Sequence, residues 1–420
     1  MQHNEIYMCL EVSEYAIKAV VAEYYNSKTI VLASAKREFA YHEDGSDDIK
    51  KVISELKVEI ASLLGYEIKN TILIIPSNHC RKFSDKVKVD TIAQSMVVSK
   101  EEIAKGIENL VKNNDNNKDF VVSVAVDKYS AYGYGYVSNP VGLETRYIEL
   151  EASVYTVPTA IAYPLIKLIE GAGFNVVDVC LDIVAISKEA IMPSALKTGA
   201  IIVDMNYSST NIAHFKNNIL KSYATIELGG KHITNDLALC AQIDYAKAES
   251  FKRKYVNLNI DDINDLVIYS YYDEVNDEEI EISQTFISEI AKSRMDEILN
   301  LVDREIANLD IEDGEVIYIC GGANNINGLE TMLKEKIKYP YQICSSKILG
   351  ARDSGYIKCL GAIKNEASFS RIRGEIKLFV NKKDYINSIN LVEKNNLLYN
   401  NGSKIENDFI KRLVSYIFNN

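Results

Sequence analysis

The N-terminal part of the chain has a hydrophobic pattern that predicts three strands, a helix and a fourth strand. Residues 6–12 are mostly apolar, residues 13–25 alternate loosely, and residues 29–41 repeat the pattern after a short turn. A helical stretch follows at 47–64, and the run NTILIIP at 70–76 is almost continuously apolar. Such a run is typical of a strand that is buried on both faces of a sheet. The predicted order is therefore β-β-β-α-β.

The same order recurs in the second half of the chain. Residues 198–228 form three predicted strands with tight turns, a pair of helices follows, and residues 315–322 make a buried strand that ends in glycines. An internal duplication of a β-β-β-α-β-α unit is the simplest interpretation, and it places the chain in the α/β class. Between the copies, residues 84–164 contain one helix and two strong strands, which we interpret as a small α+β insertion.

Composition and charge exclude several classes of protein. The 420 residues include 59 acidic and 47 basic side chains, and the net charge of −12 argues against a protein that coats nucleic acid. The seven cysteines form no CxxC pair, so we expect small core residues in a reducing cytoplasm rather than a disulfide scaffold or a zinc ribbon. There is no apolar window of ~18 residues and no basic start of a signal peptide. We therefore expect a soluble, cytoplasmic, multi-domain protein.

Two polar segments have a composition of their own. Residues 257–282 contain the acidic runs DDIND and DEVNDEEIE, whose spacing does not match a calcium-binding loop. We favour a solvated helix–loop face over a metal site for this segment. Residues 381–407 are rich in Asn and Lys and are expected to form a weakly ordered tether.

Two predicted strands end in a carboxylate. Glu11 ends the first strand of the first copy, and Asp204 ends the first strand of the second copy. In a cradle made of two such strand–turn–strand units, backbone N–H groups contact nucleotide phosphates and the carboxylates hold hydrated Mg²⁺. A single acid at a strand end is otherwise simply solvated, and this alternative stays open for both residues.

Two further segments have the composition of nucleotide contacts. The run ICGGANNINGL at 319–329 opens from a buried strand through two glycines into a predicted helix; the glycines would admit a ligand ring or phosphate, and the asparagines could cap the helix. Glu249 and Lys252 lie three residues apart on one face of another predicted helix. The alternatives are a plain strand-to-helix turn and an ordinary i,i+3 salt bridge.

Several motifs along the chain have a recognisable form. The most specific are NPVGLETRYIELEASVYTV at 139–157 and FIKRLVSYIF at 409–418. The others are IPSNHCRK, GAIIVDMNYSSTNIAHFKNNIL, ELGGKHITNDLA, AESFKRKY and EVIYICGGANNINGLE. With these motifs the sequence resembles the FtsA family of actin-like bacterial cell-division proteins over essentially its whole length. The first two motifs carry most weight, because other actin-like ATPases lack both.

The resemblance implies an actin-like (ribonuclease H-like), two-lobed fold with an inserted subdomain and a C-terminal amphipathic helix. The division of the chain that it implies is residues 1–83 as subdomain 1A, completed by 350–380; 84–163 as the inserted subdomain 1C; 164–232 as subdomain 2A, completed by 310–349; 233–309 as subdomain 2B; 381–407 as the tether; and 408–420 as a membrane-targeting helix.

The resemblance also implies a site for ATP or ADP with Mg²⁺, in which Glu11 and Asp204 would hold the metal through water. The first phosphate turn has Ser13 and Glu14 where the family has a glycine and a hydroxyl residue, and the second turn, at 206–209, has no glycine left. We therefore expect weakened nucleotide binding and at most weak ATP hydrolysis. The implied nucleotide-binding residues are Glu11, Ser13, Lys18, Asp204, Asn206, Ser208, Ser209, Gly229, Gly230, Glu249, Lys252, Gly321, Gly322, Ala323 and Asn324.

The partners that the resemblance implies are FtsZ, further copies of the chain and a membrane, with no nucleic acid among them. Arg294 and Glu297, on a predicted helix at 286–302, match the positions that contact the C-terminal peptide of FtsZ; a solvent-exposed helix residue is the less favoured alternative for Arg294. A filament would form through actin-like contacts. The protein would act on the cytoplasmic side of the cell membrane, at the division site.

The last residues form an amphipathic pattern at ~100° per residue. Two adjacent cations on the polar face suit anionic lipid headgroups, and a core helix is the alternative. The implied membrane-binding residues are Phe409, Ile410, Lys411, Arg412, Leu413, Val414, Ile417 and Phe418.

Two other classes of function stay open beside a division adaptor. An actin-fold phosphotransferase or phosphohydrolase would need intact glycine-rich turns, and a pilus-assembly actin homologue would lack the terminal helix. The five histidines form no recognisable Ser/His/Asp or Cys/His arrangement, so no catalytic residue is assigned.

Overall fold

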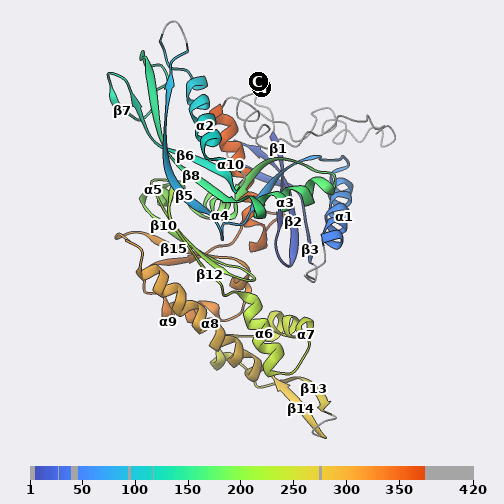
Figure 1. The fold of residues 1–420 in the computed structure, drawn as a ribbon. Helices are drawn as coiled ribbons and strands as arrows, with labels where there is room; N and C mark the ends of the chain where they lie inside the picture. Colours follow the sequence, from blue (N-terminus) through green and yellow to red (C-terminus); the bar gives the residue numbers. More distant parts are fainter. Residues whose placement is uncertain are drawn as a thin grey trace. The chain divides into compact units, whose positions relative to one another are not determined.

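A computed structural model describes residues 5–26, 28–38, 46–92, 96–116, 118–273 and 277–373. These residues divide into two units (Figure 1). Unit 1 contains the described residues up to Glu189, together with Lys347–Arg352 and those from Tyr356 onward. Unit 2 contains Ala190–Ser346 and Asp353–Gly355. The predicted membrane-targeting helix at 408–420 and the tether at 381–407 lie outside the described residues.

The first unit is built on a five-stranded sheet with the strand order β3-β2-β1-β4-β9. β1 pairs antiparallel with β2, and β2 with β3, whereas β1, β4 and β9 run parallel to one another. The elements of this sheet and its helices are β1 (Glu5–Val12), β2 (Ala16–Tyr25), β3 (Lys28–Glu38), α1 (Ser46–Leu64), β4 (Asn70–Ile75), α3 (Thr159–Gly171), β9 (Asn175–Leu181), α4 (Asp182–Ala190) and α10 (Ile357–Arg373).

Both faces of this sheet are buried. Tyr7 and Cys9 of β1 share a core with Leu360 and Ile363 of α10. Met8 and Leu10, which alternate with them along β1, are also fully buried and point to the other face, since successive strand residues alternate in direction. The continuous apolar runs in the sequence are explained by this double coverage.

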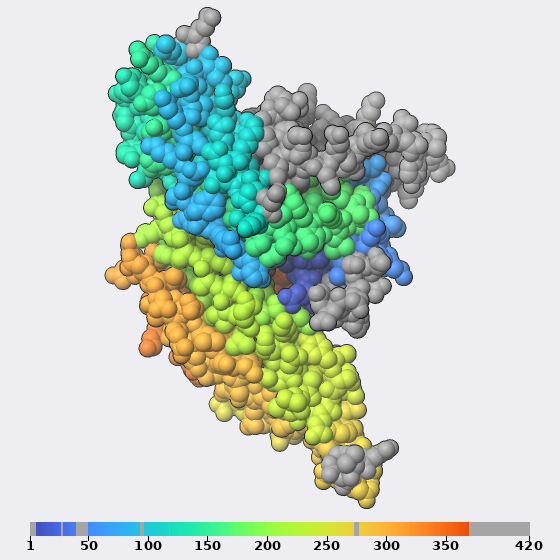
Figure 2. All heavy atoms as spheres, viewed as in Figure 1, coloured from blue at the N-terminus to red at the C-terminus, as the bar shows by residue number. Residues whose placement is uncertain are grey.

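An inserted block follows β4 in the chain. Its four-stranded sheet has the order β5-β8-β6-β7 and packs against one helix. The helix begins at a capping box, in which Ser99 and Glu102 bond to each other's backbone N–H groups. Figure 2 shows the block as a continuous blue-to-green body at one end of unit 1. Its elements are β5 (Arg81–Asp90), α2 (Lys100–Asn114), β6 (Asp119–Ala131), β7 (Gly135–Val137) and β8 (Tyr147–Pro158).

The second unit repeats the sheet of the first. Its strand order is β12-β11-β10-β15-β16, with the same two antiparallel pairs followed by two parallel pairs. The predicted duplication is therefore confirmed. The strands are β10 (Ala200–Met205), β11 (Thr210–Lys216), β12 (Ile219–Ile226), β15 (Val316–Cys320) and β16 (Tyr341–Ile343), and the short helix α5 (Pro193–Thr198) precedes them.

Besides its sheet, unit 2 contains the helices α6, α7 and α8 and a β-hairpin, which lies at the end of the unit far from the sheet (Figure 1). α8 is the longest, and its buried residues share one core with β10 and β15. The short helix α9 (Leu329–Lys336) joins the same core. The remaining elements are α6 (Gly230–Cys240), α7 (Tyr245–Tyr255), the 3₁₀ turn η1 (Ile260–Asp262), β13 (Val267–Asp273), β14 (Glu278–Ser283) and α8 (Gln284–Ala307).

The structure corrects three sequence predictions. The acidic segment 257–282 is largely a β-hairpin, β13–β14, rather than a helix–loop face, because Ile280 and Ile282 alternate with glutamates as a strand requires. Residues 164–189, assigned to the second lobe, belong to unit 1, because β9 pairs with β4 along its whole length. Cys320 forms a disulfide with Cys344, because Cys320 ends β15, Cys344 follows the parallel neighbour β16, and their Cα atoms lie 5.1 Å apart.

Other cysteines agree with the prediction of small core residues. Cys9, Cys180 and Cys359 are free and buried, whereas Cys240 is exposed. No described helix is both long enough and apolar enough to span a bilayer.

Candidate functional site

The end of β1 carries the first predicted nucleotide residues. Glu11 lies directly opposite Lys18 in the antiparallel pair β1–β2, and the Lys18 ammonium group lies 3.1 Å from the Glu11 carboxylate. Both side chains are buried. Although burial opposes the charged form, the Glu11 carboxylate raises the pKa of Lys18 above its ordinary value. Ser13 closes the turn between the strands, because its hydroxyl donates to the Ala16 carbonyl at 2.8 Å.

The ends of the two neighbouring parallel strands and the start of α10 add three residues that the sequence analysis did not assign. Ser77 follows β4, and Asp182 follows β9; the Asp182 Oδ1 atom accepts hydrogen bonds from the Ser77 backbone and hydroxyl and from the Ile183 N–H. Lys358, in the first turn of α10, lies 3.6 Å from Asp182 Oδ2 and 3.9 Å from Glu11 Oε1. An acid after a buried strand was a usable sign for Asp182, whereas nothing in the local sequence indicated Lys358.

In unit 2, the turn at 206–209 is packed onto the beginning of α6. The Asn206 and Tyr207 carbonyls accept hydrogen bonds from the N–H groups of Gly230 and Lys231, at 2.9 and 2.7 Å. A Cβ atom at Gly229 would lie 2.5 Å from the Asn206 carbonyl oxygen, so only glycine allows this contact. The first N–H groups of a helix are a ready site for an anion. Here the turn itself satisfies two of them.

The side chains of the same turn are also engaged inside the unit. Asn206 donates to Asp204 Oδ2 at 2.7 Å, and the Asp204 side chain is fully buried. The Tyr207 hydroxyl bonds to the Tyr245 hydroxyl at the start of α7. Burial, together with this contact, raises the pKa of Tyr245. Ser209, which the sequence also assigned to the nucleotide, is buried.

Glu249 and Lys252 form an i,i+3 ion pair at 2.7 Å, which is the alternative to a nucleotide contact, and both side chains are largely buried. The Lys252 ammonium group also bonds to the Gly230 carbonyl at 3.0 Å and to the Thr234 hydroxyl at 2.7 Å. Burial lowers the pKa of Lys252 in spite of the nearby carboxylate. For Glu249, burial opposes ionisation, but Lys252 and its other partners hold the pKa below its usual value. The network therefore fixes α7 against the first turn of α6.

The glycine segment after β15 leads into a 3₁₀ turn and not directly into the predicted helix. Gly321 has φ +98°, and a Cβ atom there would lie 2.2 Å from the Met205 carbonyl oxygen, so this glycine is required by the neighbouring strand end. A 3₁₀ turn, η2 (Gly322–Asn325), follows, and it contains the predicted residues Gly322, Ala323 and Asn324.

The asparagines of this segment do not cap the next helix. The N-cap residue of α9 is Gly328, which makes no side-chain bond, and Asn324 instead donates to the Ile319 carbonyl at 2.8 Å. The buried Asn324 carbonyl oxygen accepts no hydrogen bond from the described part of the chain. It is an acceptor suited to a ligand amino or hydroxyl group.

Arg294 is a structured residue rather than a freely solvated one. It lies on α8 and forms a bidentate salt bridge with Asp236 of α6, in which Nε and Nη2 donate to the two carboxylate oxygens at 2.6 and 3.1 Å. It also pairs with Glu297. The hydrogen bond with Asp236 raises the pKa of Arg294. The side chain keeps 26% of its surface exposed. The predicted peptide contacts are therefore adjacent, and Asp236 joins them.

The two predicted magnesium residues lie in different units. The Glu11 carboxylate already has lysine partners on both oxygens, and Asp204 accepts from Asn206. Across the described ranges, no group of three or more His, Cys, Asp or Glu side chains is arranged to hold a metal ion. Mg²⁺ in proteins is usually held by one or two carboxylates together with waters and phosphates. The surroundings of Glu11 do not fit this requirement.

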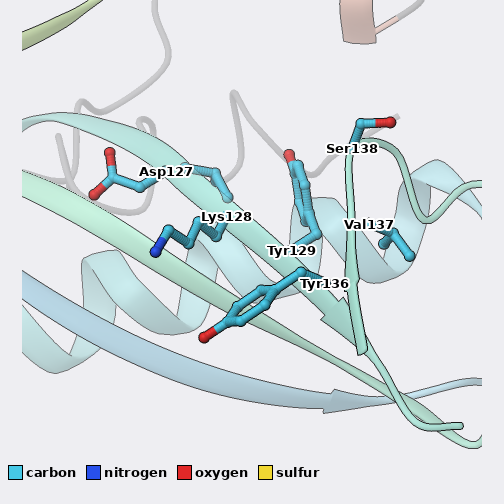
Figure 3. A pocket seen from close by; sticks show the side chains of 7 residues that line it. Asp127, Lys128, Tyr129, Tyr136, Val137 and Ser138 are labelled. Carbon is cyan, nitrogen blue, oxygen red and sulfur yellow. The ribbon is translucent and has the colours of Figure 1, made fainter. Parts of the chain in front are cut away.

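An open surface pocket of about 540 Å³ lies in the inserted block. Strands β6 and β7 line it, and Figure 3 shows Lys128 beside the ring of Tyr136, from which the ammonium group is 5.3 Å. The pocket has no carboxylate-rich or glycine-rich wall, and none of the predicted nucleotide residues lines it.

Comparison with known proteins supports the resemblance seen in the sequence. A family model described as cell division protein FtsA matches residues 201–361. The cell division protein FtsA of Bacillus subtilis is 22% identical over 391 residues, which cover 89% of this chain and 86% of that protein. The resemblance to FtsA is confirmed. The FtsA of Enterococcus hirae, 20% identical, extends it to 96% of this chain and 92% of that protein.

Solved structures support the fold. A structure titled PilM-PilN type IV pilus biogenesis complex superposes with a TM-score of 0.54 at 14% identity, over 84% of this chain and 96% of that one. MreB5 of Spiroplasma citri bound to ADP gives a TM-score of 0.51 at 14% identity, over 88% and 98%. The FtsA-like chain therefore has an actin-like fold, as the sequence predicted. At this identity the likeness extends to the fold alone.

Proposed function

We propose that this chain is an actin-like cell-division adaptor that polymerises and binds the C-terminal peptide of FtsZ. In this role it attaches FtsZ to the inner face of the membrane. The observation that carries the proposal is that the similarity to an FtsA protein covers 96% of this chain, which leaves too few residues over to omit the inserted block. Actin-fold enzymes share the units, so the insertion favours an adaptor. The exposed part of Arg294 and the neighbouring Glu297 supply charged contacts for a peptide.

A peptide-binding experiment tests this function directly. A synthetic FtsZ C-terminal peptide should bind the full chain, and Arg294→Ala should weaken binding by at least about tenfold, the effect of losing a charge-assisted hydrogen bond. Because Arg294 also holds Asp236, the same variant should lower the melting temperature somewhat.

Asp236→Asn is the matched control. It removes the structural ion pair but leaves the arginine, so it should destabilise the protein similarly while preserving peptide affinity. Equal loss of binding in both variants would assign Arg294 to structure alone and contradict the proposed peptide site.

ATP or ADP would bind chiefly through its adenosine part. The unpartnered carbonyl oxygen of Asn324 supports an adenosine contact in η2. The turn at 206–209 instead uses two of its carbonyls to satisfy α6, which leaves fewer helix N–H groups for phosphate. Nucleotide would then serve to stabilise or regulate the protein, with slow hydrolysis or none.

Membrane attachment rests on the amphipathic pattern of the residues after 408 alone. One such helix would bind the membrane weakly and reversibly. A polymer would carry many of these helices, and their combined binding would attach it firmly. The full chain should sediment with anionic vesicles, and Leu413→Asp should abolish most of that binding by placing a charge in the apolar face. Ser415→Asp, on the polar face, is the control and should retain clearly more binding. Unchanged sedimentation of the Leu413 variant would contradict the membrane role.

A further inference from the structure

The buried polar cluster of unit 1 consists of Glu11, Lys18, Asp182 and Lys358. Its two carboxylates come from the ends of parallel strands that flank β4, and the ammonium groups come from β2 and α10. The exposed fractions of the four side chains are between 6 and 12%. Two negative and two positive charges cancel within the cluster. A buried charge is expensive unless it is paired, so each member needs the others.

Lys358 has an unusual position for a cation. It lies in the first turn of α10, where the helix dipole disfavours positive charge. Its Nζ atom is 3.6 Å from Asp182 Oδ2 and 3.9 Å from Glu11 Oε1, so it bridges two carboxylates from distant parts of the chain. The Oδ1 atom of Asp182 accepts hydrogen bonds from Ser77 and from the Ile183 N–H. Its Oδ2 atom is thereby directed at Lys358.

These distances match those of a hydrated divalent cation. Magnesium binds water at ~2.1 Å, and that water would donate to a carboxylate at ~2.7 Å, which places the metal ~4 Å from the carboxylate oxygen. We propose that the Lys358 ammonium group occupies the place of a divalent cation between Glu11 and Asp182, so that unit 1 neither needs nor binds Mg²⁺. Lys18 neutralises the remaining charge of Glu11.

The first test uses the full chain and magnesium alone. The melting temperature of the wild type should be the same with excess Mg²⁺ and with a chelator. Lys358→Gln should lower it in chelator, because two buried carboxylates lose their shared cation, and excess Mg²⁺ should restore several degrees. Lys364→Gln is the matched control, since Lys364 lies on the same helix and pairs with Glu189. It should show no response to magnesium.

Two results would overturn the proposal. One is a wild type that Mg²⁺ stabilises by several degrees, with the gain lost in Glu11→Gln; the other is a folded Lys358→Gln variant that magnesium does not stabilise. If Lys358→Gln does not fold, the double variant Glu11→Gln, Lys358→Gln restores charge balance. It should fold and ignore Mg²⁺, and a magnesium response of that variant would likewise contradict the assignment.

A second test rests on the proposed nucleotide site. ADP affinity of the wild type should change less than about twofold between Mg²⁺ and chelator. An affinity about tenfold higher with magnesium would overturn the built-in cation while leaving nucleotide binding intact. Absence of ADP binding in both conditions would instead refute the nucleotide site, and the melting experiment would still decide the role of Lys358.

Discussion

The two five-stranded sheets have one strand order and one pattern of pairing, yet their corresponding strand ends are completed in different ways. In unit 1, Glu11 at the end of β1 is held by lysines from β2 and α10. In unit 2, Asp204 near the end of β10 accepts from Asn206, and the following turn bonds to α6 through its carbonyls. The two copies therefore share strand order and pairing, but their buried polar groups have different hydrogen-bond and ion-pair partners.

This difference separates what the fold requires from what a ligand requires. Groups that bond within a unit contribute to its stability whether or not nucleotide is present. The Asn324 carbonyl oxygen, by contrast, is buried and has no hydrogen-bond partner in the described chain, so the fold itself leaves this group unsatisfied.

The largest effect is expected from the glycines that allow close backbone contact, one in each unit. Gly321→Ala would place a Cβ atom 2.2 Å from the Met205 carbonyl oxygen at φ +98°, and Gly361→Ala would place one 1.8 Å from that of Ala185. Each should lower the free energy of unfolding by about 3 kcal/mol or more, measured by urea denaturation. Gly230→Ala, whose nearest neighbour would be 3.6 Å away, should change it by less than about 0.5 kcal/mol. Equal stability of Gly321→Ala and Gly230→Ala would refute the tight contact.

Loss of Lys252 should come next. Lys252→Met removes the ammonium group from the Gly230 carbonyl and from Glu249, which keeps Arg253 as its remaining cation. The loss of these buried hydrogen bonds should cost roughly 1–3 kcal/mol. Lys334→Met on α9 breaks an exposed i,i+4 pair with Glu330 and should cost less than about 0.5 kcal/mol. Similar losses in thermal unfolding for the two variants would mean that the α6–α7 network is not stabilising.

The second phosphate turn can be opened by one substitution. Tyr207→Gly removes the contact with Tyr245 and should cost about 1 kcal/mol of stability. It should also raise the ratio of ADP to adenosine affinity severalfold, because phosphate gains access to the turn. Gly322→Val in η2 should abolish binding of both ligands. Calorimetric titration checks both variants, and an unchanged affinity ratio in Tyr207→Gly would exclude the turn as a phosphate contact.

The first turn should show the smallest effect. Ser13→Ala removes the hydroxyl that bonds to both the carbonyl and the N–H of Ala16, at 2.8 and 3.2 Å, in a turn also closed by a backbone bond. Because the backbone bond still closes the turn, a loss of only about 0.5 kcal/mol, the low end for one hydrogen bond, is expected from chemical denaturation. A larger loss than that of Tyr207→Gly would reverse the comparison between the turns.

Prediction from sequence succeeded where the decisive interactions are local or periodic. The double burial of β4 and β10 gave continuous apolar runs. The ion pair of Glu249 with Lys252 is the alternative that helix spacing offered, whereas the nucleotide contact that the resemblance implies for them stays a prediction. It was less successful for β13–β14, where acidic composition concealed the strand alternation. It also placed 164–189 in the wrong unit, because a parallel neighbour such as β9 is separated from its partner β4 by the whole inserted block.

The sequence by itself determined the duplicated strand order, the insertion and the resemblance to FtsA, since hydrophobic periodicity and local motifs record them directly. Only the tertiary structure decided which charges meet. Lys358 reaches Glu11 and Asp182 because the carboxyl ends of three parallel strands converge on the first turn of α10. Such a meeting depends on strand order and register between distant segments, and buried charges are stable only where that geometry pairs them. The local sequence around each residue carries no sign of its partner.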